Sequence, residues 1–407
     1  MSPTQKKQIS SALVMVIIAG CMIGIITNGV RSTFGLFTAP ISDAFGWGRE
    51  IFGFAMALQN LVWGIVQPIA GGLADRFGTA RVLSVGTLLY MIGVILMPFS
   101  ETPFTQYLTG GLLTGAGIAT ASFAIVMAAF GRRVPEEARS WAFGVAMAAG
   151  SLGQFLFAPL GQYFINSYGW QNALIMLAAV LILIIPLTIP LRGSAYTQQG
   201  DVDEVVLPFA TALTKAFGHG SYLYLVLGFF VCGFHVAFIA IHLPPYLADR
   251  GMSPDIGAWS LALIGFFNII GSYTSGVFGG KYPKHWLLSG IYFGRGLAIL
   301  FILFAPLTAF NVMVFSAVIG LLWLSTIPLT AGLVTVMFGT RYMGLLFGCV
   351  FLSHQIGSFL GVWLGGRIYD VTGSYDAMWW AGIGFAVFAG LVHLPIRENK
   401  APAFSAA

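Results

Sequence analysis

Two arginines stand inside segments that are otherwise apolar. Arg31 lies in the later part of the apolar segment at 11–37, and Arg295 lies within the segment at 286–304. Placing an arginine at the centre of a bilayer costs about 2.5 to 3.5 kcal/mol on insertion scales. All 14 acidic residues lie in polar connections or at the ends of apolar segments, so neither arginine has a carboxylate at its depth. We therefore expect both to face an aqueous cavity and to bind an anion that enters from outside the protein.

A histidine accompanies Arg31 at an interval that recurs along the chain. His235 lies 204 residues after Arg31. A guanidinium can bind a carboxylate through two parallel hydrogen bonds, and an imidazole can donate a hydrogen bond or take up a proton at about pH 6.5. We expect the two to face one cavity from opposite walls. The alternatives are that Arg31 snorkels outward or bonds backbone carbonyls, and that His235 is an ordinary packing histidine.

Other polar and aromatic side chains in apolar segments are candidates for the same cavity. His354 is the strongest of them, whereas Gln59 and Asn268 are more typical of hydrogen bonds between helices. Aromatic rings ordinarily pack or face lipid, but several facing inward would favour an aromatic cargo. The predicted substrate-binding residues are Arg31, His235, His354, Arg295, Gln59, Asn268, Phe34 and Phe238. Further aromatic candidates at similar depth are Trp63, Phe234, Phe266, Phe267, Trp323 and Phe351.

Motifs for enzyme chemistry are missing from the sequence. The chain contains no Walker sequence, no Gly-x-Ser-x-Gly, no His-Glu-x-x-His and no Cys-x-x-Cys. Its three cysteines, Cys21, Cys232 and Cys349, all lie in apolar segments, where they ordinarily act as small buried side chains. We therefore expect no catalytic residue, no metal or other cofactor, no disulfide and no nucleotide-driven reaction.

The composition is that of a membrane protein. Of the 407 residues, 57% are hydrophobic and 8% are charged, and the mean hydropathy is +0.87, against roughly 25% charged residues in soluble domains. So few charges exclude a nucleic-acid groove, and so much apolar mass excludes a disordered chain. A helix needs about 20 apolar residues to cross the hydrocarbon. Twelve segments qualify: 11–37, 52–71, 80–98, 106–131, 140–163, 171–190, 222–247, 257–279, 286–304, 310–335, 344–368 and 377–396.

The positive charges indicate how these segments are oriented. If the N-terminus is cytoplasmic, 14 of the 19 lysines and arginines fall on the cytoplasmic side, and the positive-inside rule favours that arrangement. Both termini are then cytoplasmic. The first segment is too long for the apolar core of a signal peptide. It is expected to remain as the first helix of a multi-pass protein in a bacterial inner membrane.

A polar stretch divides the chain into two related halves. It runs from 192 to 215 and separates six apolar segments from six. Adding 204 to a residue number takes Pro40 to Pro244 and Gly153 to Gly357, and such agreement in one register indicates a tandem repeat. The predicted fold is an all-α membrane protein with 12 transmembrane helices in two pseudo-symmetric six-helix halves. The expected domains are 1–191, a cytoplasmic linker at 192–221, and 222–407.

The connection between the second and third segments carries a recognisable motif. Residues 71–81 read Gly-Gly-Leu-Ala-Asp-Arg-Phe-Gly-Thr-Ala-Arg, which resembles the signature loop of the major facilitator superfamily, Gly-x-x-x-Asp-Arg-x-Gly followed by basic residues. The resemblance implies a cytoplasmic latch, in which glycines let helices approach and the acid pairs with a helix N-terminus or a basic residue. The second half has glycine where the acid would be, so only the first copy can form an acid-centred latch. Its expected members are Gly71, Asp75, Arg76 and Gly78.

Two further stretches, at 28–47 and 338–348, resemble bacterial members of the monocarboxylate and oxalate/formate exchange branch of that superfamily. The resemblance implies small organic anions as substrates, moved with a proton or in exchange. The chain departs from the pattern where charges matter: eukaryotic monocarboxylate carriers have an acid and an arginine four residues apart in the eighth span, whereas here Asn268 and Ser272 have that spacing. Binding of an anion would therefore depend on Arg31.

The expected function is secondary active transport. Without a nucleotide site, a carrier is driven by a gradient of substrate or ion, and two related halves that rock about a central site open it to each side in turn. We expect a small organic anion of mono- or dicarboxylate type, carried by a monomer in the lipid bilayer, with no nucleic-acid partner. A carrier of an aromatic, vitamin-like or amphipathic compound is the main alternative. The alternative of another class is a transporter-like receptor that binds its ligand without moving it.

Overall fold

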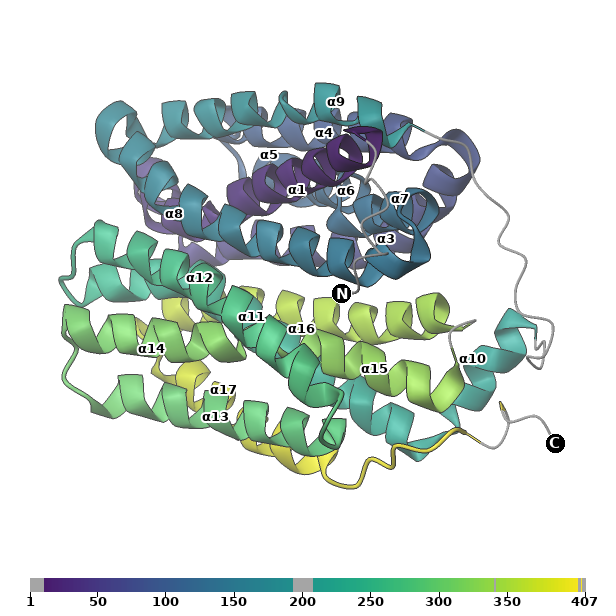
Figure 1. Ribbon diagram of the computed structural model, residues 1–407. Coiled ribbons are helices and arrows are strands. Elements are labelled where there is room, and N and C mark those ends of the chain that lie inside the picture. Colours follow the sequence, from purple (N-terminus) through teal and green to yellow (C-terminus); the bar gives the residue numbers. More distant parts are fainter. Residues whose placement is uncertain (1–10, 193–207, 340–341, 402–403, 405–407) are drawn as a thin grey trace.

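Helices account for nearly all of the described chain. A computed structural model describes residues 11–192, 208–339, 342–401 and 404. Figure 1 shows the elements of the first half packed as one bundle and those of the second half as another bundle lying against it. Eleven helices among the described residues are long and apolar enough to cross a membrane. The prediction of an all-helical membrane protein is thus confirmed.

The first half begins with a long helix that ends near Arg31. The elements of the first half are α1 (Ser11–Ser32), η2 (Phe34–Phe37), α2 (Thr38–Phe45), α3 (Arg49–Phe77), α4 (Thr79–Leu96), η3 (Met97–Phe99), α5 (Pro103–Gln106), η4 (Tyr107–Leu113), α6 (Thr114–Thr120), α7 (Phe123–Arg133), α8 (Glu136–Leu181), α9 (Ile184–Leu187) and η5 (Ile189–Leu191).

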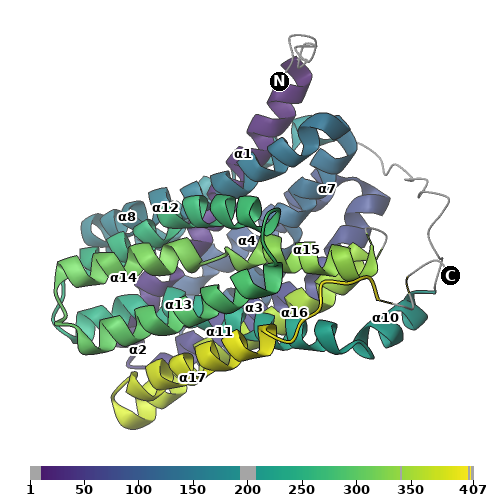
Figure 2. The same cartoon turned by 60° about the horizontal axis from the view of Figure 1, so that its bottom comes forward.

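The second half follows a short helix in the expected linker, of which residues 193–207 lie outside the described residues. Its elements are α10 (Phe209–Phe217), α11 (Gly220–Asp249), α12 (Pro254–Gly279), α13 (Lys284–Phe304), α14 (Ala309–Leu322), α15 (Thr326–Phe338), α16 (Met343–Thr372) and α17 (Asp376–His393). Figure 2 shows α2 and α10 at opposite ends of the helix bundle. These two elements mark its two ends.

The count of eleven arises because one helix contains two expected segments. α8 has 46 residues, more than twice the about 20 that cross a bilayer. Gly169 interrupts it with a φ of 81°, a conformation that residues with a Cβ rarely adopt. Its two parts correspond to the segments expected at 140–163 and 171–190. With α8 counted as two crossings, the eleven helices give the twelve that the sequence predicts.

The internal repeat is visible in the packing within each half. A Cβ on Gly153 of α8 would collide with the backbone of Ile25 in α1, and a Cβ on Gly357 of α16 would collide with the backbone of Phe230 in α11. The glycines are 204 residues apart, and the residues they touch are 205 residues apart. The same pair of helices therefore packs in the same register in both halves, with glycine allowing the close approach.

Two of the membrane-crossing segments are interrupted at equivalent positions in the two halves. In the first half the helix ends at Thr120 and restarts at Phe123, and in the second it ends at Leu322 and restarts at Thr326. The breaks are about 204 residues apart, as the repeat requires. Backbone groups freed inside a membrane need partners, because no water is available there. Discontinuous helices at corresponding positions of two repeats point to a binding site between the halves.

The motif at 71–81 is mostly helical, which differs from the expected loop. α3 runs up to Gly78, so Gly71, Asp75 and Arg76 lie in its last turns, and Gly78 joins α3 to α4 with a φ of 89°. The helix continues past the apolar segment because outward-facing polar side chains leave its backbone hydrogen bonds intact. A Cβ on Gly71 would meet nothing within 4 Å, so this conformation does not use it for close packing. The latch itself stays a prediction.

The antiparallel helices α3 and α16 join the two halves along part of their length. A Cβ on Gly64 of α3 would lie 2.8 Å from Gln355 Cβ of α16. In the same antiparallel register, Gly71 lies seven residues after Gly64 in α3, and Gly348 lies seven residues before Gln355 in α16. A Cβ on either glycine would meet nothing within 4 Å. The two helices are therefore in contact toward the start of α3 and diverge toward its end.

A second pair of helices, α8 and α12, behaves in the same way. A Cβ on Gly265 of α12 would lie 2.9 Å from Gln154 Cβ of α8. Gly144 lies ten residues before Gln154, and Gly276 lies eleven residues after Gly265; a Cβ on either would meet nothing within 4 Å. The α3–α16 pair and the α8–α12 pair therefore diverge toward the same end of the bundle. The halves therefore touch at the end of the bundle that holds α2 and separate toward the end that holds α10.

Arg295→Ala is expected to destabilise the protein, because Arg295 donates to carbonyl oxygens of Leu322 and Trp323 at the break between α14 and α15. Each buried group left without a partner costs about 1–3 kcal/mol. Thermal unfolding in detergent should show this as a lower melting temperature. Arg250→Ala, which removes an exposed arginine, is the control and should leave the melting temperature unchanged. An equal effect of the two substitutions would contradict this role for Arg295.

Candidate substrate site between the two halves

Arg31 lies in the last turn of α1 with neutral partners. Its Nη2 donates to Asn60 Oδ1 at 2.8 Å, and its guanidinium carbon lies 4.7 Å from the centre of the Trp63 ring. Its Nε is buried without a hydrogen-bond partner. The ion pairs found among the described residues do not include Arg31. A half-buried cation whose closest side-chain contacts in the described part of the chain are an amide and a ring, and that keeps an unused donor, is suited to bind an anion.

One face of α3 holds these partners in place. Asn60 Nδ2 donates to Met56 O at 2.8 Å, which turns Oδ1 toward Arg31. Trp63 Nε1 donates to Gln67 Oε1 at 2.7 Å, and Gln67 Nε2 donates to the hydroxyl of Ser122, in the break between α6 and α7, at 3.0 Å. Positions 60, 63 and 67 share one helix face. That spacing was the available signal for Asn60 and Gln67, which are absent from the predicted substrate-binding residues.

A run of rings connects Arg31 to the second half. The Trp63 ring meets the Phe351 ring edge-on at 5.5 Å between centroids, and Phe351 stacks on His354 at 5.9 Å with an interplanar angle of 8°. His354 Nδ1 lies 3.1 Å from Gln355 Oε1. Arg31, Trp63, Phe351 and His354 are all half-buried. The structure therefore brings together two predicted residues, Arg31 and His354, through two rings that were aromatic candidates.

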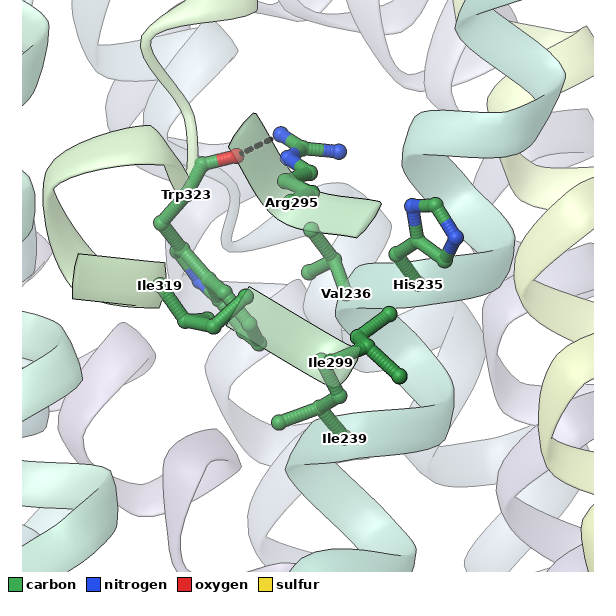
Figure 3. A pocket seen from close by; sticks show the side chains of 7 residues that line it. All are labelled: His235, Val236, Ile239, Arg295, Ile299, Ile319 and Trp323. Carbon is green, nitrogen blue, oxygen red and sulfur yellow. Dashed lines mark hydrogen bonds between the residues drawn. The ribbon is translucent and has the colours of Figure 1, made fainter. Parts of the chain in front are cut away.

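His235 has different neighbours from Arg31. Its Nε2 lies 2.8 Å from Gly382 O of α17, and its side chain is 2% exposed. Figure 3 shows His235 and Arg295 on different helices around a pocket of the second half, which Trp323 also lines. The expected meeting of Arg31 and His235 across one cavity is not among the contacts of the described residues. His235 instead belongs to the interior of the second half.

Arg295 bonds mainly to backbone carbonyls, which differs from the unpartnered cation that the sequence predicts, although its Nη1 is buried without a partner among the described residues. Its Nε and Nη2 donate to Leu322 O at 3.1 and 2.8 Å, and Nη2 also donates to Trp323 O and to Cys232 Sγ. The side chain is 1% exposed. The break after α14 frees these carbonyls, and the negative end of a helix dipole takes the place of an acid. Arg295 thus stabilises a broken helix in this conformation, and anion binding by Arg31 stays a prediction.

The predicted amides form hydrogen bonds between helices. Gln59 Nε2 donates to Gly110 O of η4 at 3.0 Å. Asn268 Nδ2 donates to Ser151 Oγ at 2.9 Å, which joins α12 to α8 across the halves, and its Oδ1 accepts from Leu324 N at 2.9 Å. Asn268 therefore connects the break in the second half to α8 of the first half through two hydrogen bonds. Its hydrogen bonds do not include Arg31.

The two predicted phenylalanines are packing residues in this conformation. Phe34 is buried and meets Tyr90 edge-on at 6.5 Å, and Phe238 is buried and meets Trp379 edge-on at 5.0 Å. Neither is in the run of rings beside Arg31. In the described part of the chain, no three histidine, cysteine or acidic side chains are grouped so as to hold a metal ion.

Comparison with known proteins finds relatives along most of the chain. Monocarboxylate transporter 13 of Rattus norvegicus is 28% identical over 371 residues, covering 89% of this chain and 84% of that protein. The uncharacterized MFS-type transporter YcxA of Bacillus subtilis (strain 168) is 26% identical over 360 residues, covering 86% of each. Monocarboxylate transporter 12 of Homo sapiens is 25% identical over 424 residues, covering 94% of this chain and 81% of that protein.

Solved structures share the fold at low sequence identity. A D-xylose-proton symporter has a TM-score of 0.74 at 14% identity, covering 95% of this chain and 98% of its own. A bacterial homologue of the human lysosomal transporter Spinster, inward-facing and unoccupied, has a TM-score of 0.75 at 14% identity, covering 97% and 100%. The family model of the Major Facilitator Superfamily matches residues 20–362. The chain therefore belongs to the Major Facilitator Superfamily and is a transporter related to the monocarboxylate transporters.

Proposed function

We propose that this transporter moves a small organic anion of mono- or dicarboxylate type by alternating access, in exchange or together with a proton. The observation that carries the proposal is Arg31, a half-buried cation between the halves that has neutral partners and an unused Nε–H. Burying a cation is costly unless it is paired. A bound carboxylate repays that cost, since guanidinium matches it with two parallel hydrogen bonds.

The relatives support this substrate class. Two of them bear the name monocarboxylate transporter and match this chain over most of its length. The charges that such carriers were expected to share are replaced here by Asn268 and Ser272, which hydrogen-bond to each other at 3.1 Å. An anion site in this chain therefore rests on Arg31 in α1, with Asn60 as the neutral group that positions the guanidinium.

A second candidate is an acid with an aromatic body. The rings of Trp63, Phe351 and His354 continue from Arg31 into the second half. Aromatic pairs contribute about 0.5–1.5 kcal/mol beyond the area they bury. A planar acid could place its carboxylate on Arg31 and its ring against Trp63, whereas a short aliphatic acid would use the arginine alone. This arrangement favours an aromatic or vitamin-like carboxylate over an uncharged amphipathic compound.

The divergence of the halves supports an orientation for this conformation. The halves touch at the end that holds α2 and separate at the end that holds α10. The positive-inside rule favours a cytoplasmic location for the linker and both termini. In a bacterial inner membrane, the carrier would then be closed to the outside and open to the cytoplasm. One chain contains both halves and so would transport as a monomer.

Arg31→Ala is expected to lower uptake of labelled carboxylates into proteoliposomes by about 100-fold, because a bound anion would lose its charged partner. Arg31→Lys should keep weak activity, since an ammonium cannot bind both carboxylate oxygens in one plane. Arg397→Ala, which removes an exposed arginine after the last helix, is the matched control. Full transport by Arg31→Ala, at equal amounts of folded protein, would rule out the anion-anchor role.

Trp63→Ala is expected to weaken benzoate binding about tenfold while changing lactate binding less, because only benzoate has a ring to pack against the indole. A thermal-shift titration of each acid against the purified protein measures both affinities, since a ligand of the folded state raises its melting temperature. Trp286→Ala, which removes an exposed tryptophan, serves as the control. Equal losses for the two acids would favour the short-acid candidate.

Counterflow distinguishes a carrier from a receptor. Proteoliposomes loaded with an unlabelled carboxylate should accumulate the labelled one transiently, because alternating access exchanges the two across the membrane. The measurement uses an acid that the thermal-shift titration shows to bind. Saturable binding with no accumulation would identify a receptor and refute transport.

A further inference from the structure

Arg49 joins the two halves at the end of the bundle where they touch. From the first turn of α3, its Nη1 and Nη2 donate to the two carboxylate oxygens of Asp249 at 2.6 and 2.5 Å, and its guanidinium carbon lies 3.9 Å from the centre of the Tyr369 ring. Asp370 accepts the backbone N–H groups of Arg49 and Glu50, each at 2.8 Å, as suits an anion at a helix N-terminus. We call Arg49, Asp249 and Asp370 the Arg49 gate.

A buried histidine lies behind this gate and reaches it through one hydroxyl. His242 of α11 has an exposed fraction of 0%. Its Nδ1 lies 3.1 Å from the Tyr375 hydroxyl, and Arg49 Nη1 donates to the same oxygen at 3.1 Å. Its Nε2 lies 2.8 Å from Val362 O. The imidazole therefore connects the backbone of α16 to the Arg49 gate.

These contacts determine where the hydrogens lie. A carbonyl oxygen only accepts, so Nε2 of His242 carries a hydrogen and donates it to Val362 O. A guanidinium only donates, so the Tyr375 oxygen accepts from Arg49 and directs its own hydrogen to Nδ1 of His242. Each donor has an acceptor, and the imidazole is neutral. The closed gate thus fits the unprotonated histidine.

A proton on Nδ1 disturbs this order. Nδ1 would become a donor facing a hydroxyl hydrogen, and the imidazolium would place a second positive charge close to Arg49. The nearby carboxylates are already engaged, since Asp249 binds Arg49 and Asp370 binds the start of α3. The charged and titratable groups that the contacts of the described residues place around His242 and the gate are Arg49 and Glu50 of α3, Arg367, Tyr369 and Asp370 of α16, Tyr375 before α17, and Tyr246 and Asp249 of α11.

We propose that His242 is a proton-binding site, and that its protonation and closure of the Arg49 gate exclude each other. A proton that binds more tightly to the open gate must, by linkage, favour the open state as the pH falls. The orientation rests on the proposed function, in which the gate faces outside the cell. Acid outside would then open the carrier outward and admit its cargo.

His242 fits this role better than His235, which the sequence favours. His235 bonds Gly382 O inside the second half and lies with Arg295 around one pocket. Its contacts among the described residues do not reach the Arg49 gate. A proton there would leave the contacts between the halves unchanged, whereas a proton on His242 acts on the side chain that joins them.

Double electron–electron resonance between two spin labels tests the proposal. Labelled cysteines replace Glu101, which is exposed before α5, and Ala309, which is exposed at the start of α14, and serines replace the native cysteines. Lowering the pH from about 8 to about 5 should raise the ratio of open to closed distances about tenfold, a typical size for coupled equilibria. In His242→Gln the ratio should stay constant, because an amide can donate to Val362 O and accept from Tyr375 without taking up a proton.

Two further variants complete the test. His393→Gln is the matched control, because His393 is also buried and bonds a carbonyl, Ala389 O at 2.7 Å; it should respond to pH as the parent does. Tyr375→Phe removes the hydroxyl between His242 and Arg49 and should weaken the pH response relative to the parent, because only the repulsion between the imidazolium and Arg49 remains. This second variant tests the proposal if the His242→Gln protein folds poorly. A parent protein insensitive to pH, or a His242→Gln protein that responds like the parent, overturns the proposal. No substrate is required, so failure of carboxylate transport would be a separate result.

Discussion

Inside a bilayer every polar group must find its partner within the protein, and this constraint explains where the functional residues lie. In the second half, the break after α14 frees carbonyl oxygens, and Arg295 satisfies them. In the first half, Arg31 contacts Asn60 and the face of Trp63. Arg295 is 1% exposed and donates to two backbone carbonyls, whereas Arg31 is half-buried and donates to one amide. Each also keeps one buried nitrogen without a partner among the described residues, Nη1 of Arg295 and Nε of Arg31. This difference in exposure and bonding is the reason for proposing Arg31, and not Arg295, as the substrate-binding cation.

The packing between the halves places this site at the point where their contact ends. Gly64 of α3 touches Gln355 of α16, and the next residue back along each helix belongs to the run of rings, Trp63 on one side and His354 on the other. Beyond Gly64 the two helices diverge. The rings therefore stand between a closed end and an open end, which is where alternating access requires a binding site.

The closed end depends on a small number of strong contacts. Exposed ion pairs usually contribute about 0–1 kcal/mol each, but Arg49 binds Asp249 through two parallel hydrogen bonds and lies against Tyr369. Such geometry is stronger than a single exposed pair. Because the same guanidinium donates to Tyr375, the contact between the halves is linked to the protonation state of His242.

Periodicity and charge were sufficient for the architecture. The twelve apolar segments correspond to the observed helices once α8 is divided at Gly169, and the 204-residue interval reappears in the contacts of Gly153 and Gly357. Arg31 could be chosen as a candidate from the sequence because an arginine in an apolar segment is costly unless it has a partner. The motif at 71–81 was predicted to be a loop because the apolar segment ends at 71. The helix α3 nevertheless continues to Phe77, since its backbone hydrogen bonds do not depend on apolar side chains.

The sequence by itself determined which segments are apolar enough to enter a membrane, how they repeat, and which cations enter with them, because those properties belong to single residues and their spacing. Tertiary structure decided which partners each cation and each histidine meets. Whether Arg295 finds carbonyls depends on a break in a different helix, and whether His242 reaches Arg49 depends on a tyrosine 133 residues away along the chain. Such partners come together only through packing, so no local pattern reports them.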